Sequence, residues 1–231
     1  MENTTHKSSN LNLKTLVSGI IVLAVIAGAI VFSTMRPTLP VKNTDTASNQ
    51  VIDISAMPYT GKADAPLVVS YWYDYQCPFC KQFEEQIIRK LKTDYVDTGK
   101  MKIVWRDFQF LGPDSTSTGL IARAVWETTP EKFYEWHEEV YKMQDEENAG
   151  WGNKEDVLIL TSKMGINRQT IENLLLIKNK EYQQNLENDR KEGSSLGVRG
   201  TPTLTIGKDT IIGFQSYEEL KIKIDSLLNT Q

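Results

Sequence analysis

Cys77 and Cys80 are the only cysteines of the 231-residue chain, and they stand three residues apart in the sequence Cys-Pro-Phe-Cys. Two thiols at this spacing can form one reversible disulfide with each other, but they cannot build a framework of several disulfides. They also supply only half of the ligands of a structural zinc site, and the only histidines are His6 and His137. The residue types and spacing therefore favour thiol–disulfide exchange.

Other interpretations of the pair stay open at this point. The cysteines could be half of a zinc site, or a chance occurrence of the spacing. They could also form an inert structural disulfide, although closing so short a loop removes little chain entropy. The position of the pair between a buried strand and a helix favours the redox interpretation.

The elements that must position the thiols can be predicted from the flanking residues. Residues 67–73 form a continuous run of β-branched and aromatic residues, typical of a central strand buried on both faces. An amphipathic helix is predicted after the pair, and Pro78 suits its first turn. Unpaired N–H groups and the helix dipole at this end favour a thiolate. We expect Cys77 to be the exposed attacking thiol and Cys80, one turn later, the shielded resolving thiol.

A second motif lies far downstream, where Thr201 and Pro202 precede the apolar residues 203–206. A proline at the entrance of a strand donates no hydrogen bond and often marks a cis peptide bond. An ordinary proline of an edge strand remains the alternative for this motif on its own.

The remaining pattern predicts an α/β fold. A strand is expected at 102–108, parallel to the first because a right-handed crossover joins them. A mostly helical stretch follows at about 115–196, then strands at 203–206 and 210–212 and a helix opened by a capping box at Ser216. This order predicts a thioredoxin-type core with an inserted helical domain.

The N-terminal part of the chain predicts a single transmembrane helix at 16–35, after a tail at 1–15. No charge falls between Lys14 and Arg36, and the 21 uncharged residues match the thickness of a bilayer core. A signal peptide cleaved near 27–29, followed by secretion, is the alternative. Residues 36–50 are expected to be a linker and 51–231 the folded domain. We expect this domain outside the cytoplasm, where disulfides persist.

The overall charge excludes some classes of function. The net charge of −4 and the pI of about 5.4 argue against a nucleic-acid-binding protein, which needs a basic face. The acidic residues 145–147 lack the alternating oxygen ligands and the glycine of a calcium loop, so they are expected to be solvated surface. No metal and no cofactor are predicted.

The chain resembles the DsbA family of thioredoxin-like proteins, in its membrane-anchored or secreted branch, from about residue 61 to 228. The resemblance is carried by segments 61–66, 73–80 and 198–203, and more weakly by 106–108 and 132–137. It implies that Cys77 attacks, Cys80 resolves, and a cis Pro202 packs against the disulfide. It also implies that Pro78 and Phe79 support the site and that Thr201 offers backbone hydrogen bonds to a substrate strand.

One residue departs from this family pattern. Thioredoxin and DsbA carry a buried acid six residues before the first cysteine, where it assists proton transfer. Tyr71 occupies that position here, and Asp74 stands at the end of the strand. His137 matches a position without a catalytic role in the family. The proton acceptor for Cys80 therefore stays open.

The resemblance predicts a protein disulfide oxidoreductase, which most simply oxidises dithiols of exported proteins and is reoxidised by a membrane partner. The Pro-aromatic pair between the cysteines resembles oxidising family members more than reducing thioredoxin. An extracytoplasmic reductase or isomerase is the first alternative, because the same fold spans about −270 to −120 mV. The second is a membrane-tethered chaperone or binding module whose dithiol is incidental, with Tyr75 and Phe79 as exposed aromatic contacts.

Overall fold

The structure is a computed structural model that describes residues 57–147 and 149–230. The predicted tail, the predicted transmembrane helix at 16–35 and the predicted linker at 36–50 lie outside the described residues. Within the described ranges, no helix is both long and apolar enough to cross a membrane.

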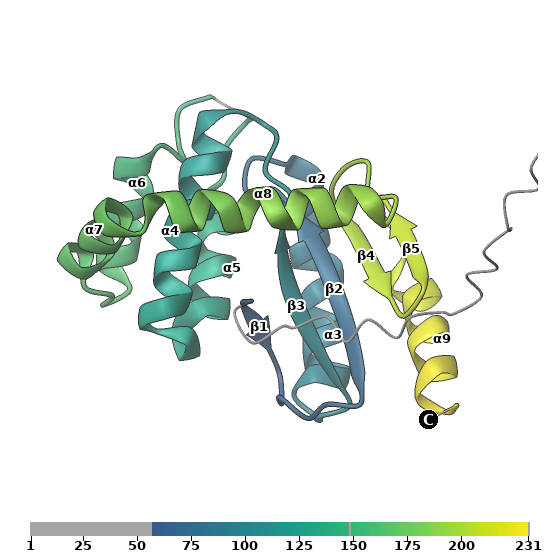
Figure 1. Cartoon of the computed structure of the whole chain (residues 1–231). Helices are drawn as coiled ribbons and strands as arrows, with labels where there is room; N and C mark the ends of the chain where they lie inside the picture. The colour runs from purple at the N-terminus through teal and green to yellow at the C-terminus, as the bar shows by residue number, and fades with distance from the viewer. Residues whose placement is uncertain (1–56, 148, 231) are drawn as a thin grey trace, which may run out of the picture. The chain divides into compact units, whose positions relative to one another are not determined.

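Five strands form one sheet in the order β1-β3-β2-β4-β5 (Figure 1). The strands are β1 (Tyr59–Thr60), β2 (Leu67–Tyr73), β3 (Met101–Asp107), β4 (Thr203–Ile206) and β5 (Asp209–Ile212). β2 and β3 run parallel, with Leu67 opposite Met101 and Tyr73 opposite Asp107, whereas the other three pairs are antiparallel. The predicted parallel pair and the predicted C-terminal strands are confirmed.

The helix that follows the cysteines is less regular than its sequence predicts. It consists of α2 (Pro78–Phe83), a π-helical turn η1 (Glu84–Ile88), α3 (Arg89–Leu91) and a second π-helical turn η2 (Lys92–Val96). Each π turn ends on two neighbouring buried residues, Ile87 with Ile88 and Tyr95 with Val96. The wider π turn lets both side chains of such a pair point into the core. In an α-helical turn the two neighbouring side chains would point in different directions.

Helices fill the segment between β3 and β4, as predicted for about 115–196. They are α4 (Pro113–Thr128), α5 (Phe133–Met143), α6 (Lys154–Lys163), α7 (Arg168–Ile177) and α8 (Asn179–Ser195), with a 3₁₀ turn η3 (Pro130–Lys132) before α5. The chain returns to the sheet after α8 and ends in α9 (Tyr217–Leu228). The capping box predicted at Ser216 opens α9.

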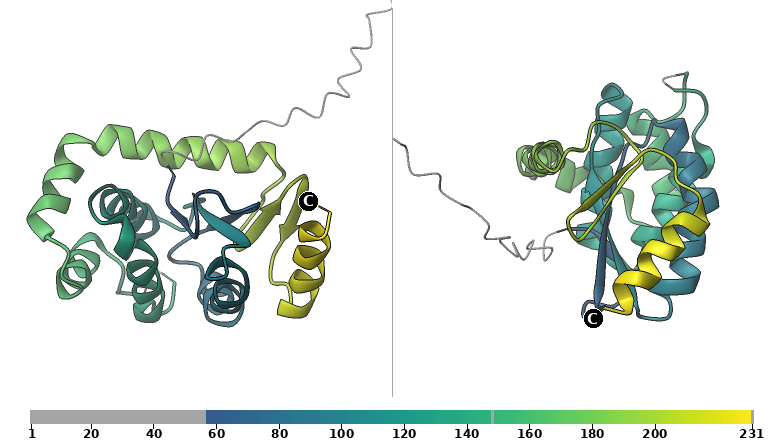
Figure 2. Two further views of the ribbon diagram at one scale, coloured as in Figure 1. Left: turned by 90° about the horizontal axis from the view of Figure 1, so that it is seen from below. Right: turned by 90° about the vertical axis from the view of Figure 1, so that its right-hand side faces the viewer.

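The helix α8 crosses one face of the sheet, while α2 to η2 and α9 cover the other (Figure 2). The two faces follow from the alternation of side chains in β2. The ring of Tyr71 packs on Phe83 of α2. The ring of Trp72 points the opposite way, to Gly193 of α8, where a methyl group would meet its carbon atoms at 2.8 Å.

Buried charges fix α8 to the strand β3. The Arg123 guanidinium donates to Asp107 and to Asp189 of α8, each at 2.6 Å. Arg106 of β3 lies 3.0 Å from Asp189 and pairs with Glu192 as well. The two arginines and the two aspartates are almost fully buried, so their mutual pairing is what makes the burial of their charges tolerable.

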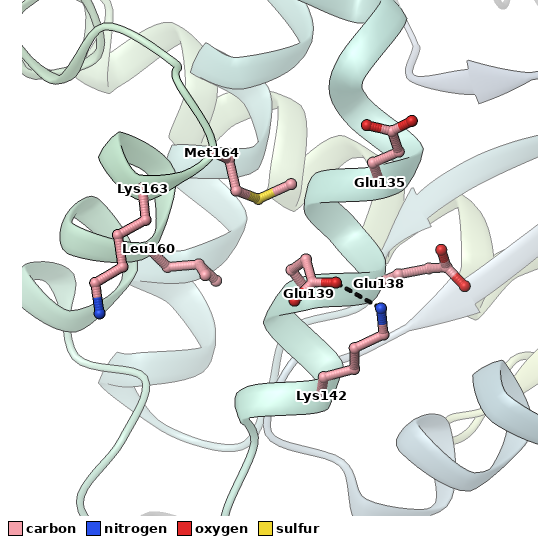
Figure 3. Close-up of a pocket in the computed structure, with 7 residues that line it drawn as sticks. All are labelled: Glu135, Glu138, Glu139, Lys142, Leu160, Lys163 and Met164. Carbon is pink, nitrogen blue, oxygen red and sulfur yellow. Dashed lines mark hydrogen bonds and ion pairs between the residues drawn. The ribbon is translucent and has the colours of Figure 1, made fainter.

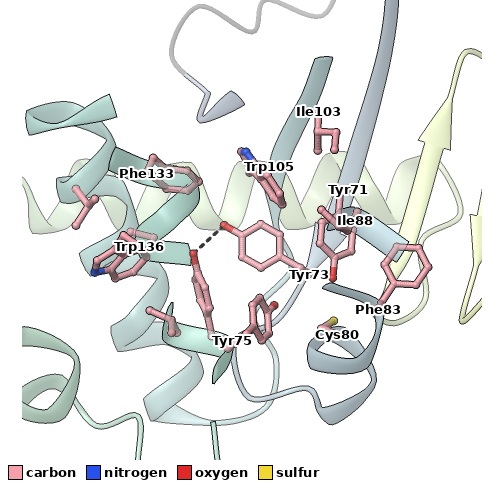
Figure 4. Close-up of a cluster of buried hydrophobic side chains, with 14 of the residues drawn as sticks. Tyr71, Tyr73, Tyr75, Cys80, Phe83, Ile88, Ile103, Trp105, Phe133 and Trp136 are labelled. Atoms are coloured by element: carbon pink, nitrogen blue, oxygen red, sulfur yellow. Dashed lines mark hydrogen bonds between the residues drawn. The ribbon is translucent and has the colours of Figure 1, made fainter. Parts of the chain in front are cut away.

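Aromatic side chains dominate the core between the sheet and α5 (Figure 4). Tyr75 belongs to this cluster and is 1% exposed, so its predicted role as an exposed aromatic contact is wrong. Its ring packs against Tyr73, Trp136 and Tyr141, and its hydroxyl lies 3.0 Å from Nδ1 of His137. α5 covers this position, which the local sequence around the cysteines does not reveal.

Candidate active site

The two predicted motifs meet at the N-terminal end of α2. Cys77 is the cap residue that precedes α2, and Pro78 occupies the first helical turn, as predicted. The Thr201–Pro202 peptide bond is cis. The Cys77 thiol donates to the carbonyl oxygen of Thr201 at 3.4 Å, across 124 residues of sequence. Both cysteines are free thiols in this structure.

The exposure of the site differs from the prediction. Cys77 is 4% exposed and Cys80 is fully buried, so the expectation of an openly exposed attacking thiol is wrong. The loop that carries Thr201 and Pro202 lies over Cys77 and limits access to its sulfur. Phe79 is 59% exposed, and it is this ring that the motif presents to solvent.

The two thiols differ strongly in acidity. Hydrogen bonding from the Cys80 side chain lowers the pKa of Cys77 to about 6, against the opposing effect of burial. The Thr201 side chain and the backbone N–H groups of Cys80 and Phe79 add to this stabilisation of the thiolate. Burial raises the pKa of Cys80 well above its usual range, and the neighbouring Cys77 raises it further. Of the two thiols, Cys77 therefore ionises the more readily, and Cys80 stays protonated.

Asp74 and Gln144 hold the loop between β2 and α2, and the sequence did not predict this role for either residue. The Asp74 carboxylate accepts hydrogen bonds from the backbone N–H groups of Gln76, Phe110 and Leu111 and from the Ser115 hydroxyl. Asp74 is thus a buried anchor of the loop, and burial raises its pKa.

Gln144, at the end of α5, donates its amide to the carbonyl oxygens of Tyr75 at 2.7 Å and Cys77 at 3.2 Å. These bonds tie the inserted helical domain to the start of α2. No local signal marks Gln144, because its role depends on a contact across 67 residues.

A buried acid does lie below the cysteines, although not at the position that the family pattern predicts. Glu84 of η1 is 1% exposed, and its Oε2 lies 3.7 Å from Nε2 of His137. Tyr71 stands at the expected position of the acid, is fully buried, and points its hydroxyl toward Cys80 (Figure 4). The only signal for Glu84 in the sequence is its spacing of four residues from Cys80 on the buried face of the helix.

One surface hollow lies apart from the thiols. An open groove of about 540 Å³ lies between α5 and α6 (Figure 3), lined by Glu135, Glu138, Glu139, Lys142, Leu160, Lys163 and Met164. Its charged side chains partly pair with one another, as Lys142 does with Glu139. None of the predicted site residues borders it, so the chemistry of the thiols takes place elsewhere.

Comparisons with known proteins agree with this geometry. The thioredoxin family matches residues 55–226. The disulfide bond formation protein D of Bacillus subtilis is 29% identical over 178 residues, which cover 76% of this chain and 78% of that protein.

Solved structures give the same result. The crystal structure of oxidised BdbD from Bacillus subtilis superposes with a TM-score of 0.70 at 28% identity, covering 76% of this chain and 95% of that one. The thiol-disulfide exchange protein α-DsbA2 of Wolbachia pipientis gives a TM-score of 0.66 at 27% identity, covering 76% and 88%. With its paired thiols, its cis-proline loop and its helical insert, the chain belongs to the thioredoxin family, as a DsbA-like protein disulfide oxidoreductase.

Proposed function

We propose that this protein oxidises dithiols of exported proteins through a Cys77–Cys80 disulfide. The observation that carries the direction is the low pKa of Cys77, about 6. A stabilised Cys77 thiolate favours the reduced form of the pair, so the disulfide gives up its oxidising equivalents readily. The name of the Bacillus subtilis relative, disulfide bond formation protein D, points the same way.

In the proposed reaction, a substrate thiolate attacks Cys77 Sγ in the disulfide and Cys80 leaves. The resulting mixed disulfide is then attacked by the second substrate thiol, which releases an oxidised substrate and the reduced pair. The exposed Phe79 and the neighbouring Pro78 form the surface beside the thiols. The loop of Thr201 and Pro202, which already contacts Cys77, is placed to hold the backbone of a substrate strand.

The proposal extends to location and partners. A catalytic domain that oxidises exported proteins acts outside the cytoplasmic membrane, and the apolar segment 16–35 is proposed to anchor it there. Each turnover leaves the pair reduced, so a membrane-bound redox partner is needed to remove the two electrons.

The reduction potential of the pair tests the direction of electron flow. We expect equilibration with glutathione to give a potential well above about −250 mV, toward the oxidising end of the −270 to −120 mV range of the fold. A value at or below −250 mV would instead support the reductase alternative.

Variants of the two cysteines test the roles of the thiols. Cys77→Ser is expected to abolish oxidation of a reduced, unfolded model substrate, because it removes the sulfur that is attacked. Cys80→Ser is expected to form a long-lived mixed disulfide with glutathione through Cys77, detectable by mass spectrometry. Full activity in Cys77→Ser would contradict the redox function and favour the binding-module hypothesis.

A further inference from the structure

Gln144 is almost fully buried at the end of α5, and its amide nitrogen faces two carbonyl oxygens. It is 4% exposed, and Nε2 donates to the carbonyl oxygens of Tyr75 at 2.7 Å and Cys77 at 3.2 Å. Because both neighbours accept hydrogen bonds, the nitrogen of the amide must face them, and this fixes the orientation of the amide. Its oxygen Oε1 is left without a partner among the described residues. A buried amide that gives up a hydrogen bond in this way calls for an explanation beyond packing.

The Cys77 carbonyl that receives this bond also begins the helix α2. It accepts from the backbone N–H groups of Cys80 at 3.0 Å and Lys81 at 3.2 Å, which are the first hydrogen bonds of the helix. The direction of this carbonyl therefore sets the direction of the first turn. That turn includes the N–H groups of Phe79 and Cys80, which stabilise the Cys77 thiolate. A donor to the carbonyl from outside the helix holds the turn in place.

The start of α2 holds Gln144 in return. Lys81 donates its ammonium group to the Gln144 carbonyl oxygen at 2.6 Å. One turn earlier on α5, the Tyr141 hydroxyl donates to the carbonyl oxygen of Asp74 at 3.0 Å, in the loop that precedes the cysteines. Hydrogen bonds thus join the end of α5 and the start of α2 in both directions. Of the two α5 side chains, Gln144 is the one that bonds to Cys77.

We propose that Gln144 is a positioning residue of the dithiol site, which holds the Cys77 carbonyl and thereby keeps the first N–H groups of α2 directed at the Cys77 sulfur. The inserted helical domain then sets how strongly the pair oxidises, because a shift of the end of α5 weakens the support of the thiolate. Gln144 bonds to a backbone carbonyl and not to a sulfur, so it acts through the helix. The inference rests on the dithiol chemistry proposed above and names a residue that controls it.

Gln144→Met tests this role, because methionine keeps the length and the apolar stem of glutamine and removes the amide. We expect the pKa of Cys77 to rise from about 6 by about one unit. The pH dependence of Cys77 alkylation by iodoacetamide in the reduced protein measures this pKa. The equilibrium with glutathione at pH 7 should move about fivefold toward the disulfide, because a less stable thiolate makes the reduced pair less favourable.

Tyr141→Phe is the matched control, since it removes a hydrogen bond between the same two elements and leaves the Cys77 carbonyl bonded. The Asp74 carbonyl that loses this bond still accepts from the backbone N–H of Cys77 at 3.1 Å. Both variants should lower the free energy of unfolding in urea, but Tyr141→Phe should leave the midpoint of alkylation near pH 6. A merely structural role of Gln144 would make the two variants behave alike.

The wild-type protein allows a measurement that needs no variant to fold. In the reduced protein, the NMR resonances of the Gln144 side-chain amide should shift with the same midpoint as the ionisation of Cys77, because the new charge polarises the hydrogen bond to its carbonyl. In the oxidised protein, which has no thiol to ionise, they should stay constant over this range. The exposed amide of Gln169, which bonds to Asn173, is the internal reference and should stay constant in both forms.

Three outcomes would overturn the proposal. They are constant Gln144 resonances in the reduced wild type, an unchanged Cys77 pKa in a folded Gln144→Met protein, and an equal rise of this pKa in Tyr141→Phe. If the expected effects of Gln144 are present but the wild-type protein fails to oxidise a reduced model substrate, the proposed direction of electron flow is wrong and the positioning role stands.

Discussion

The low pKa of Cys77 comes from the groups around its sulfur and not from open exposure. It is 4% exposed, yet hydrogen bonds from Cys80, Thr201 and the first N–H groups of α2 lower its pKa to about 6. Near neutral pH the reduced protein therefore carries mostly a thiolate at Cys77. The thiol of the unfolded chain has a pKa of about 8.5, so the lowered pKa stabilises the folded reduced form. This stabilisation is fully present above a pH of about 8.5 and is lost as the pH falls through 6.

Thr201→Val tests the contribution of one of these groups. The change removes the side-chain hydroxyl that lowers the pKa of Cys77, although this hydroxyl makes no hydrogen bond of ordinary geometry in the described ranges. It keeps the branched shape and the backbone carbonyl that contacts the Cys77 sulfur. We expect the pKa of Cys77 to rise by about one unit, equivalent to ~30 mV toward a more reducing pair. The pH dependence of the rate of Cys77 alkylation by iodoacetamide reports this pKa.

Thr210→Val serves as the control, since its hydroxyl bonds to Leu196 away from the thiols. It should leave the midpoint of the alkylation profile near pH 6. An unchanged midpoint in Thr201→Val as well would mean that the hydroxyl takes no part in stabilising the thiolate.

The two motifs that meet at the site were predictable from sequence, whereas the side chains that hold them in place were not. The spacing of Cys77 and Cys80 and the Thr201–Pro202 pair are local patterns with a direct chemical meaning. The hydrogen bonds of Gln144 and the burial of Glu84 have no such pattern, because they depend on how α5 packs against η1 and the start of α2. Tyr75 was misjudged for the same reason, since the helix that covers it comes later in the chain.

At the scale of elements, the boundaries of the sheet and of the helical insert follow the sequence closely. The insert begins at Pro113 and ends at Ser195, within two residues of the prediction. The sequence did not predict the π turns after Cys80. An apolar face that contains neighbouring pairs such as Ile87 and Ile88 fits an α-helix almost as well as a helix with π turns. Which turn forms depends on contacts with the sheet and α9, and those contacts involve distant residues.

Gly193→Ala tests the close approach of α8 to the sheet. Helix propensity alone favours alanine by about 1 kcal/mol. The new methyl group would, however, lie 2.8 Å from the fully buried ring of Trp72, which has no space to move. We expect the free energy of unfolding to fall by about 1–3 kcal/mol in urea denaturation.

Ser194→Ala on the exposed side of α8 is the matched control and should change stability little. A Gly193→Ala protein as stable as the wild type, or more stable, would show that α8 can move outward without loss.

At the scale of the whole molecule, the buried charges between β3, α4 and α8 decide how the insert is attached. Arg123 links Asp107 with Asp189, and Arg106 adds Glu192. Burial raises the pKa of Asp189 to about 6, against the lowering effect of the two arginines. In the unfolded chain the pKa of Asp189 is about 3.9, so between a pH of about 6 and about 3.9 the folded state binds one more proton than the unfolded state. Asp189 therefore increases the free energy of unfolding as the pH falls through 6.

Arg123→Leu should therefore be destabilising in a pH-dependent way. It leaves two buried carboxylates with less compensation, which costs about 3–5 kcal/mol near neutral pH. The difference from the wild type should shrink toward pH 5, because Asp189 then takes up a proton and loses its charge. Urea denaturation at several pH values measures this difference.

Arg168→Leu removes a partly exposed arginine that pairs with Glu155 and Glu172 at the surface, and it should show little effect at any pH. A deficit in Arg123→Leu that is constant with pH, or that grows in acid, would contradict the assigned titration of Asp189.

The long helix α8 joins the outer helices of the insert to the loop beside the thiols, and it is fixed to the sheet in between. Near its C-terminal end it is clamped to the sheet by Gly193 against Trp72 and by Asp189 against the arginines, only a few residues before the loop of Thr201 and Pro202. We expect these contacts to resist any bending at its other end, where it joins α7. We therefore expect substitutions in the outer helices of the insert to leave the geometry beside the thiols unchanged.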